Sequence, residues 1–332
     1  MDNYAAGTEA GGLRLTERVI PVPKSVSPEA QAALSMARPE QPPFPPLTDI
    51  AGWKARIEQM NTGMTAMMRG PVMALPVTSH LETIAGVPVY FAEPPDVPAG
   101  NRDKAMVYFH GGGLVLLGGE CVELFARLEA LSTRCRVYAV DYRNPPDHPY
   151  PAAIDDCIAV YRVLLDTYSP AQLVISGASG GGNLAAAVPL KMRDQGVPLP
   201  GAIGLWTPEV DLTESGDTFH TCEDIDVVLK RGLPAMNALY ANGADLAHPY
   251  LSPLFGDFTK GWAPTFIQTG TRDVFLSNSA RIHRTLRNAD IIAELHVGEA
   301  MPHGGFGNAP EDREIRLEFL KFLAKHAGWA AP

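Results

Sequence analysis

Short apolar runs recur along the chain and alternate with stretches whose apolar residues follow a helical spacing. Apolar runs of this length, bounded by turn residues, are typical of strands in a sheet that is covered on both faces. We therefore predict strands at residues 87–92, 105–109, 136–140, 173–176, 202–206, 264–269 and 291–297. Strands that alternate with helices predict an α/β fold, with a mostly parallel central sheet flanked by helices.

Helices are predicted between most of these strands. Residues 122–133 carry Leu124, Leu128 and Leu131 at helical spacing, and Pro151 opens a second helix over 152–168. The first eighty residues differ in composition from the rest of the chain, because many prolines lie between positions 21 and 46. An amphipathic stretch follows over residues 49–68. Its apolar side chains share one helical face, and simple packing on the core is the first interpretation of that face: Trp53, Ile57, Met60, Met64 and Met67.

Composition narrows the functional classes. The chain has 332 residues, 46% of them hydrophobic, and a formal net charge of −10. We expect no nucleic-acid partner, because a basic surface is missing, and no membrane span, because no apolar run reaches eighteen residues. The N-terminus carries acidic residues where a signal peptide would carry basic ones, so we expect a cytoplasmic protein.

The four cysteines have no metal-ligand spacing, and we expect them to be reduced and mostly buried. No nucleotide-binding or dinucleotide-binding loop and no metal-binding motif is recognisable, so we expect no metal and no cofactor. The acidic residues Glu223, Asp224 and Asp226 could suggest a metal cluster. A solvated helix start is the better interpretation, because acids favour a helix N-terminus.

The most informative motif is Gly177-Ala178-Ser179-Gly180-Gly181, which directly follows a predicted strand. A serine with glycines two positions away on either side, between a strand and a helix, is typical of a nucleophile elbow. The sharp turn needs neighbours without bulk and exposes the serine hydroxyl. The motif therefore predicts that Ser179 is a nucleophile.

A second motif, His110-Gly111-Gly112-Gly113, follows the predicted strand 105–109. Adjacent glycines let the main chain approach a ligand closely, so their N–H groups can stabilise the oxyanion of a tetrahedral intermediate. A flexible turn is the alternative interpretation. Because the same chain holds an elbow serine, we expect this loop to serve as the oxyanion hole.

A nucleophilic serine needs a base, and the base needs a carboxylate that orients it. In α/β-hydrolases the acid and then the base follow the serine in the chain. Asp273 and His303 fit this order, because each follows a predicted strand. His296 is the nearest competing base but lies inside a strand. Glu299 is the first substitute acid, and Asp273 could alternatively cap the helix predicted over 277–286.

These motifs together resemble the hormone-sensitive lipase-like family of α/β-hydrolases, the bacterial family IV esterases. The resemblance runs from about residue 87 to the C-terminal helix. It includes the motifs Tyr108-Phe109-His110-Gly111-Gly112-Gly113, Asp141-Tyr142-Arg143, Leu251-Ser252-Pro253-Leu254 and Met301-Pro302-His303, besides the elbow. The resemblance implies Ser179 as nucleophile, His303 as base and Asp273 as acid.

The resemblance also assigns supporting roles. The main chain of Gly112, Gly113 and Gly180 would supply the oxyanion donors. His110 and Gly111 would support that loop, His110 through hydrogen bonding rather than as a base. We expect Asp141 and Arg143 to form an ion pair that braces it.

Three departures concern substrate preference and rate rather than reaction type. Ala178 and Gly180 stand where the family usually has Asp or Thr and then Ala. Val274 and Asn278 replace a proline and an acidic residue after the catalytic acid. A second glycine, Gly305, separates the base from Phe306.

The resemblance further implies a helical cap. We expect residues 1–80 to form an N-terminal cap segment and residues 207–242 a second cap insertion. The catalytic core would then comprise residues 81–206 and 243–332. Flexible methionines would give the cap an adaptable apolar wall.

The sequence thus predicts a serine carboxylesterase that hydrolyses short-to-medium apolar esters through an acyl-enzyme. The partner would be a small-molecule ester, and a homodimer through an exposed sheet edge would fit relatives of this kind. An amide, lactone or carbamate hydrolase with the same triad stays open as an alternative. A non-catalytic ligand receptor on this fold is a second alternative, for which relatives that lost the histidine base are the precedent.

Overall fold

The computed structural model describes residues 7–9, 12–14, 19–36, 42–229 and 233–332. Parts of both predicted cap segments lie outside these ranges, and so do residues 1–6, which belong to the N-terminus on which the expected localisation rests. Its helices are α1 (Pro28–Ser35), α2 (Ile50–Met73), α3 (Glu120–Thr133), α4 (Ala152–Leu164), α5 (Gly180–Asp194), α6 (Thr218–Thr221), α7 (Leu233–Ala241), α8 (Leu276–Asn288) and α9 (Pro310–His326).

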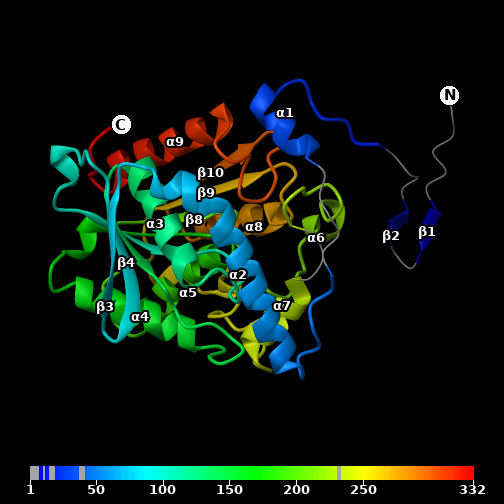
Figure 1. Ribbon diagram of the computed structural model, residues 1–332, viewed down its shortest axis with the longest axis horizontal. Coiled ribbons are helices and arrows are strands. Elements are labelled where there is room, and N and C mark those ends of the chain that lie inside the picture. The colour runs from blue at the N-terminus through cyan, green and yellow to red at the C-terminus, as the bar shows by residue number, and fades with distance from the viewer. Residues whose placement is uncertain (1–6, 10–11, 15–18, 37–41, 230–232) are drawn as a thin grey trace.

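Eight strands form one sheet in the order β10-β9-β8-β7-β5-β6-β4-β3 (Figure 1). They are β3 (Thr78–Ile84), β4 (Val87–Glu93), β5 (Ala105–Phe109), β6 (Arg136–Val140), β7 (Leu173–Ala178), β8 (Ala202–Trp206), β9 (Thr265–Gly270) and β10 (Ala293–Gly298). The six strands from β10 to β6 pair in parallel, while β4 and β3 join antiparallel. A separate hairpin pairs β1 (Gly7–Glu9) with β2 (Gly12–Arg14).

The predicted α/β class is confirmed, and so are all seven predicted strands to within about two residues at each end. Strand β3 was missed. It lies at the edge of the sheet, and its side chains are mostly exposed or half-buried, so it shows no apolar run of the kind that marks the central strands.

Alternate residues of each central strand pack on opposite faces of the sheet. In β5, Val107 and Phe109 join an apolar cluster with α4, α5 and α8, whereas Met106 and Tyr108 join one with α3 and α9. The sheet is therefore covered on both faces, which explains why its strands are continuous apolar runs rather than alternating ones.

A third apolar cluster lies over the carboxyl ends of the strands. It combines α2 and the second predicted insertion with two loops of the core, through Trp53, Val115, Leu116, Phe219, Leu233, Met236, Leu239, Val274 and Phe275. Figure 1 shows α2 running along the same side of the molecule as α7. The expected apolar face of α2 is only partly correct, because Met67 is 67% exposed.

Within the described residues, no helix combines the length and apolar character needed to cross a membrane.

Candidate active site

Ser179 stands between β7 and α5 in a strained conformation, with φ 57° and ψ −122°. A residue with a side chain pays roughly 1–3 kcal/mol there, so the surrounding structure must impose the turn. The Ser179 N–H donates to the carbonyl of Trp206 on β8 at 2.9 Å. A Cβ at Gly181 would overlap the carbonyl oxygen of Phe109. The motif therefore forms the sharp turn that its glycines predicted, and the serine side chain is half-buried.

The glycine loop after β5 lies against this serine. A Cβ at Gly111 would be 3.5 Å from the Cβ of Ser179. Gly112 has a φ of +109°, which residues with a side chain rarely adopt. Its carbonyl accepts the N–H groups of Val115 and Leu116 at 3.1 and 2.9 Å, so a tight turn holds the loop in place.

Three backbone N–H groups at this junction have no acceptor among the described residues: those of Gly112, Gly113 and Gly180. Gly113 and Gly180 are buried, and a Cβ at Gly180 would lie 3.0 Å from the Gly113 nitrogen. Buried N–H groups are seldom left unpaired in folded proteins. Unpaired donors that converge beside a serine can bind an oxyanion.

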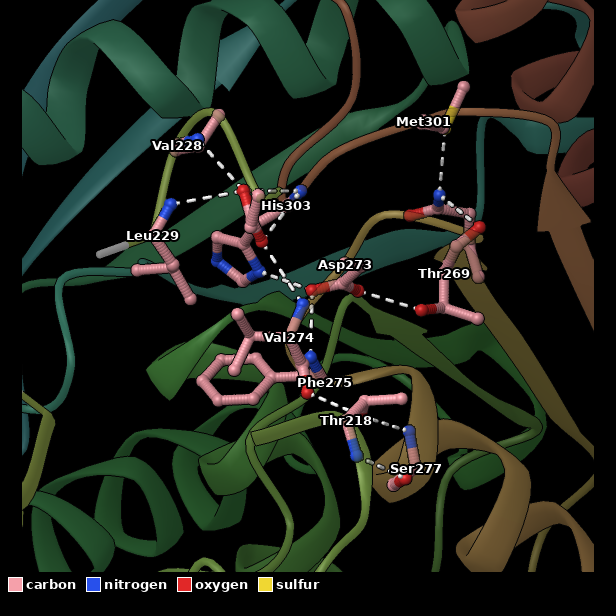
Figure 2. Close-up of polar contacts among 12 residues, drawn as sticks. Thr218, Val228, Leu229, Thr269, Asp273, Val274, Phe275, Ser277, Met301 and His303 are labelled. Atoms are coloured by element: carbon pink, nitrogen blue, oxygen red, sulfur yellow. Dashed lines mark hydrogen bonds and ion pairs between the residues drawn. The ribbon is translucent and has the colours of Figure 1, made fainter. Parts of the chain in front are cut away.

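Asp273 and His303 meet at the carboxyl ends of β9 and β10. Nδ1 of His303 lies 3.1 Å from Oδ1 of Asp273 (Figure 2). Oδ2 of Asp273 accepts the Thr269 hydroxyl at 2.7 Å, and Oδ1 also accepts the Phe275 N–H at 2.9 Å. Asp273 is completely buried and His303 is 6% exposed. The carboxylate therefore fixes the imidazole with its other nitrogen, Nε2, free to take a proton.

The competing candidates lie elsewhere. Glu299 is exposed after the end of β10. His296 stacks on Phe266 with ring centroids 4.5 Å apart and pairs with Glu294 at 3.5 Å. Neither contacts His303 or Asp273, so the geometry favours the pair that the resemblance implied.

The electrostatics of His303 suit a base. Burial of the imidazole alone would lower its pKa, but the hydrogen bond to Asp273 and the charges of Asp273, Asp226 and Glu209 outweigh burial. The pKa of His303 is therefore raised above its ordinary value. A base with a raised pKa holds a transferred proton more firmly, which favours the imidazolium that forms during attack.

Glu209 lies beside both the serine and the histidine. Its N–H donates to the Ser179 carbonyl at 3.3 Å, and its charge contributes to the pKa of His303. The side chain is fully buried, neither carboxyl oxygen meets hydrogen-bond geometry with a group in the described part of the chain, and burial raises its pKa to about 8. Among the hydrogen bonds between described residues, none joins the Ser179 hydroxyl to Nε2 of His303.

His110 occupies a buried place beside the glycine loop. Its Nδ1 lies 2.8 Å from the Gly111 carbonyl, and its ring stacks on Tyr142 at 4.1 Å. The Tyr142 hydroxyl donates to the His110 carbonyl at 2.8 Å. Burial lowers the pKa of His110 to about 4, so the ring is neutral near pH 7 and its position suits loop support.

Two sequence predictions are wrong. Asp141 and Arg143 do not pair: Asp141 accepts the Gly119 N–H at 2.9 Å, and Arg143 pairs with Asp156 on α4 at 2.7 Å. Both residues follow the end of β6, and each side chain binds a different partner instead of pairing with the other. Asp226 is not at a solvated helix start. It is 1% exposed and accepts main-chain N–H groups, a role that no local pattern indicated.

Across the described side chains, no group of three or more His, Cys, Asp or Glu residues is arranged to hold a metal ion. The four cysteines are free and buried.

Comparison with known proteins shows which family the chain resembles. The alpha/beta hydrolase fold family matches residues 106–307. An acetyl-hydrolase of Streptomyces hygroscopicus is 34% identical over 186 residues, which cover 55% of this chain and 62% of the relative. Carboxylesterase NlhH of Mycobacterium tuberculosis is 31% identical over 239 residues, which cover 68% of this chain and 73% of the relative. The first match therefore spans less than two thirds of its relative's length.

Solved structures match over more of the chain. The crystal structure of esterase E25 has a TM-score of 0.86 at 37% identity and covers 94% of this chain and 98% of that chain. An esterase from the bacterial hormone-sensitive lipase family has a TM-score of 0.77 at 27% identity, with 91% and 99% covered. This chain therefore belongs to the α/β-hydrolase fold family and, within it, to the bacterial hormone-sensitive lipase-like esterases.

Proposed function

We propose that the protein is a serine carboxylesterase in which Ser179 is the nucleophile, His303 the base and Asp273 the acid. The observation that carries this proposal is the 3.1 Å contact between His303 and Asp273. A ligand receptor on this fold has no need of an oriented base, so this contact favours catalysis over mere binding.

In the first half of the reaction, Ser179 Oγ attacks the ester carbonyl while His303 Nε2 takes the hydroxyl proton. The N–H groups of Gly112, Gly113 and Gly180 would stabilise the oxyanion, and each such donor contributes on the order of 3 kcal/mol to lowering the barrier. His303 then gives its proton to the departing alcohol. A covalent acyl-enzyme remains.

In the second half, water attacks the acyl-enzyme carbonyl while His303 Nε2 takes a proton from the water. Collapse of the second tetrahedral intermediate releases the carboxylic acid, and the proton returns to Ser179 Oγ. Asp273 keeps its hydrogen bond to Nδ1 and stabilises the imidazolium in both halves.

We also propose that residues 1–80 and 207–242 form a cap over Ser179. The support is the apolar cluster in which Trp53 of α2 and Met236 of α7 join the loops beside the site. Met236 contacts the oxyanion loop directly, because a Cβ at Gly113 would lie 3.0 Å from its methyl carbon. Such a wall suits short-to-medium apolar acyl chains.

The first test is Ser179→Ala, assayed with 4-nitrophenyl butyrate and with a fluorophosphonate probe. We expect the wild-type protein to gain the mass of one phosphonyl group and the variant to remain unlabelled and inactive. Ser176→Ala is the matched control, because Ser176 is a buried serine of β7. Equal turnover in wild type and Ser179→Ala would refute the assignment, and an unlabelled wild-type protein would favour the receptor alternative.

Amide, lactone and carbamate cleavage would use the same tetrahedral chemistry. Rates measured on matched ester and amide analogues separate these substrates, because the amide needs protonation of a poorer leaving group. A homodimer through the exposed sheet edge is also part of the proposal, and the mass in solution tests it.

A further inference from the structure

The buried carboxylate of Asp226 connects three loops that are distant in sequence. Its Oδ1 accepts the N–H groups of Val228 and Leu229 at 2.8 and 3.1 Å, within its own loop. Its Oδ2 accepts the Val274 N–H at 3.0 Å. Both oxygens also lie 3.4 Å from the main-chain nitrogen of His303. One side chain of the predicted cap insertion therefore contacts the neighbour of the acid and the base itself.

A second connection joins the same insertion to the same loop. The Thr218 hydroxyl donates to the Val274 carbonyl at 2.7 Å and accepts the Ser277 N–H at 2.9 Å. The Thr218 N–H donates to the Ser277 hydroxyl at 3.0 Å (Figure 2). The N–H and the carbonyl of Val274 are thus both bound by side chains from residues 218–226.

We propose that Asp226 is a positioning residue, which holds the main chain beside Asp273 and at His303 so that the acid and base keep their catalytic distance. This inference rests on the proposed serine mechanism. It assigns the insertion a role beyond covering the substrate, because the geometry of the triad depends on it.

The physical reason lies in the origin of the two groups. Asp273 and His303 follow different strands, and each lies on an irregular loop after its strand has ended. Loops without shared hydrogen bonds move independently. A misplacement of about 1 Å between reacting groups costs about 10²-fold in rate, so a carboxylate that binds both loops protects the rate.

The residue at position 274 makes this connection testable. The bond from Val274 to Asp226 needs a main-chain N–H, which proline lacks. Val274→Pro therefore removes one hydrogen bond and leaves the carboxylate of Asp226, with its charge, in place. Asp226→Asn removes the charge and replaces one acceptor oxygen with a donor.

We expect Asp226→Asn to lower kcat about 10²-fold with KM within about twofold of wild type. It should also lower the pH at which kcat/KM is half-maximal, because the charges facing His303 come from Asp273 and Asp226, whereas Glu209 beside them becomes charged only near its own pKa of about 8. Val274→Pro should lower kcat less and leave that pH unchanged. Asp224→Asn is the matched control: it is an exposed aspartate of the same loop and should match wild type in both.

A direct readout is the low-field proton resonance of the hydrogen bond between His303 and Asp273, which requires no turnover. We expect Val274→Pro to shift or broaden it, and Asp224→Asn to preserve it. If Asp226→Asn fails to fold, Val274→Pro decides the question alone. Wild-type kcat and an unchanged resonance in folded Val274→Pro would overturn the proposal, as would an Asp226→Asn variant that raises KM only. Failure of the serine mechanism would show separately, as an unlabelled wild-type protein.

Discussion

Gly180 stands where the resemblance leads one to expect alanine, and the structure gives a steric reason. A Cβ at this position would lie 2.6 Å from the Leu114 nitrogen and 3.0 Å from the Gly113 nitrogen. Both neighbours are main-chain atoms, which cannot rotate away as a side chain can. Gly180→Ala must therefore displace either the glycine loop after β5 or the first turn of α5.

Two opposing effects set the size of the change in stability. Alanine is favoured over glycine within a helix by up to about 1 kcal/mol, whereas an overpacked methyl group costs about 1–3 kcal/mol. We expect a net loss of about 0–3 kcal/mol in the free energy of unfolding. Catalysis should suffer more. Loss of one oxyanion donor costs about 10²–10³-fold in kcat, and partial displacement of Gly113 should approach the lower end.

The assay is steady-state hydrolysis of 4-nitrophenyl butyrate beside a urea unfolding curve. The control is Gly63→Ala on α2, where an added Cβ meets nothing within 4 Å, so we expect unchanged kcat and slightly higher stability. A Gly180→Ala variant with wild-type kcat and KM would refute the steric argument. It would mean that the loop relaxes without losing its donors.

Two further predictions follow from the titrating groups. Because carboxylates raise the pKa of His303, kcat/KM should rise with pH and reach half its maximum above the ordinary imidazole pKa of about 6.5; a rate independent of pH between about 5 and 8 would contradict this. Glu209 has a pKa of about 8 in the folded protein against an ordinary 4.5, so between these pH values it keeps a proton that the unfolded chain releases. The free energy of unfolding therefore falls as pH rises from 4.5 to about 8, by about 3 kcal/mol at pH 7. Glu209→Gln should therefore exceed wild type in unfolding free energy by more at pH 8 than at pH 5, and an equal difference at both would count against it.

The central strands could be predicted because their environment leaves a local mark. Strands β5, β6 and β8 begin and end at the predicted residues, since a strand buried on both faces must be apolar throughout. Strand β3 leaves no such mark, because one side of it has no neighbouring strand. The sharp turn at Ser179 and the glycine loop after β5 could also be predicted, because the residues that form each of them are adjacent in sequence.

The partners of charged side chains could not be read in the same way. Asp141 and Arg143 are two residues apart, yet Arg143 pairs with Asp156, which α4 brings beside it. The sequence placed Asp226 among three solvated acids, but two of the main-chain N–H groups that donate to its carboxylate lie 48 and 77 residues away. A charged side chain pairs with groups that folding brings near it. Proximity in sequence does not predict which groups those are.

The amino-acid order alone therefore specified the strands, the strained serine turn and the glycine loop, because each depends on steric and apolar preferences of adjacent residues. Folding was needed to bring His303 to Asp273, to bury the Glu209 carboxyl group and to place Asp226 across both loops. Those contacts depend on where the loops that follow separate strands lie at the edge of the sheet. That arrangement emerges only when the whole apolar core is packed.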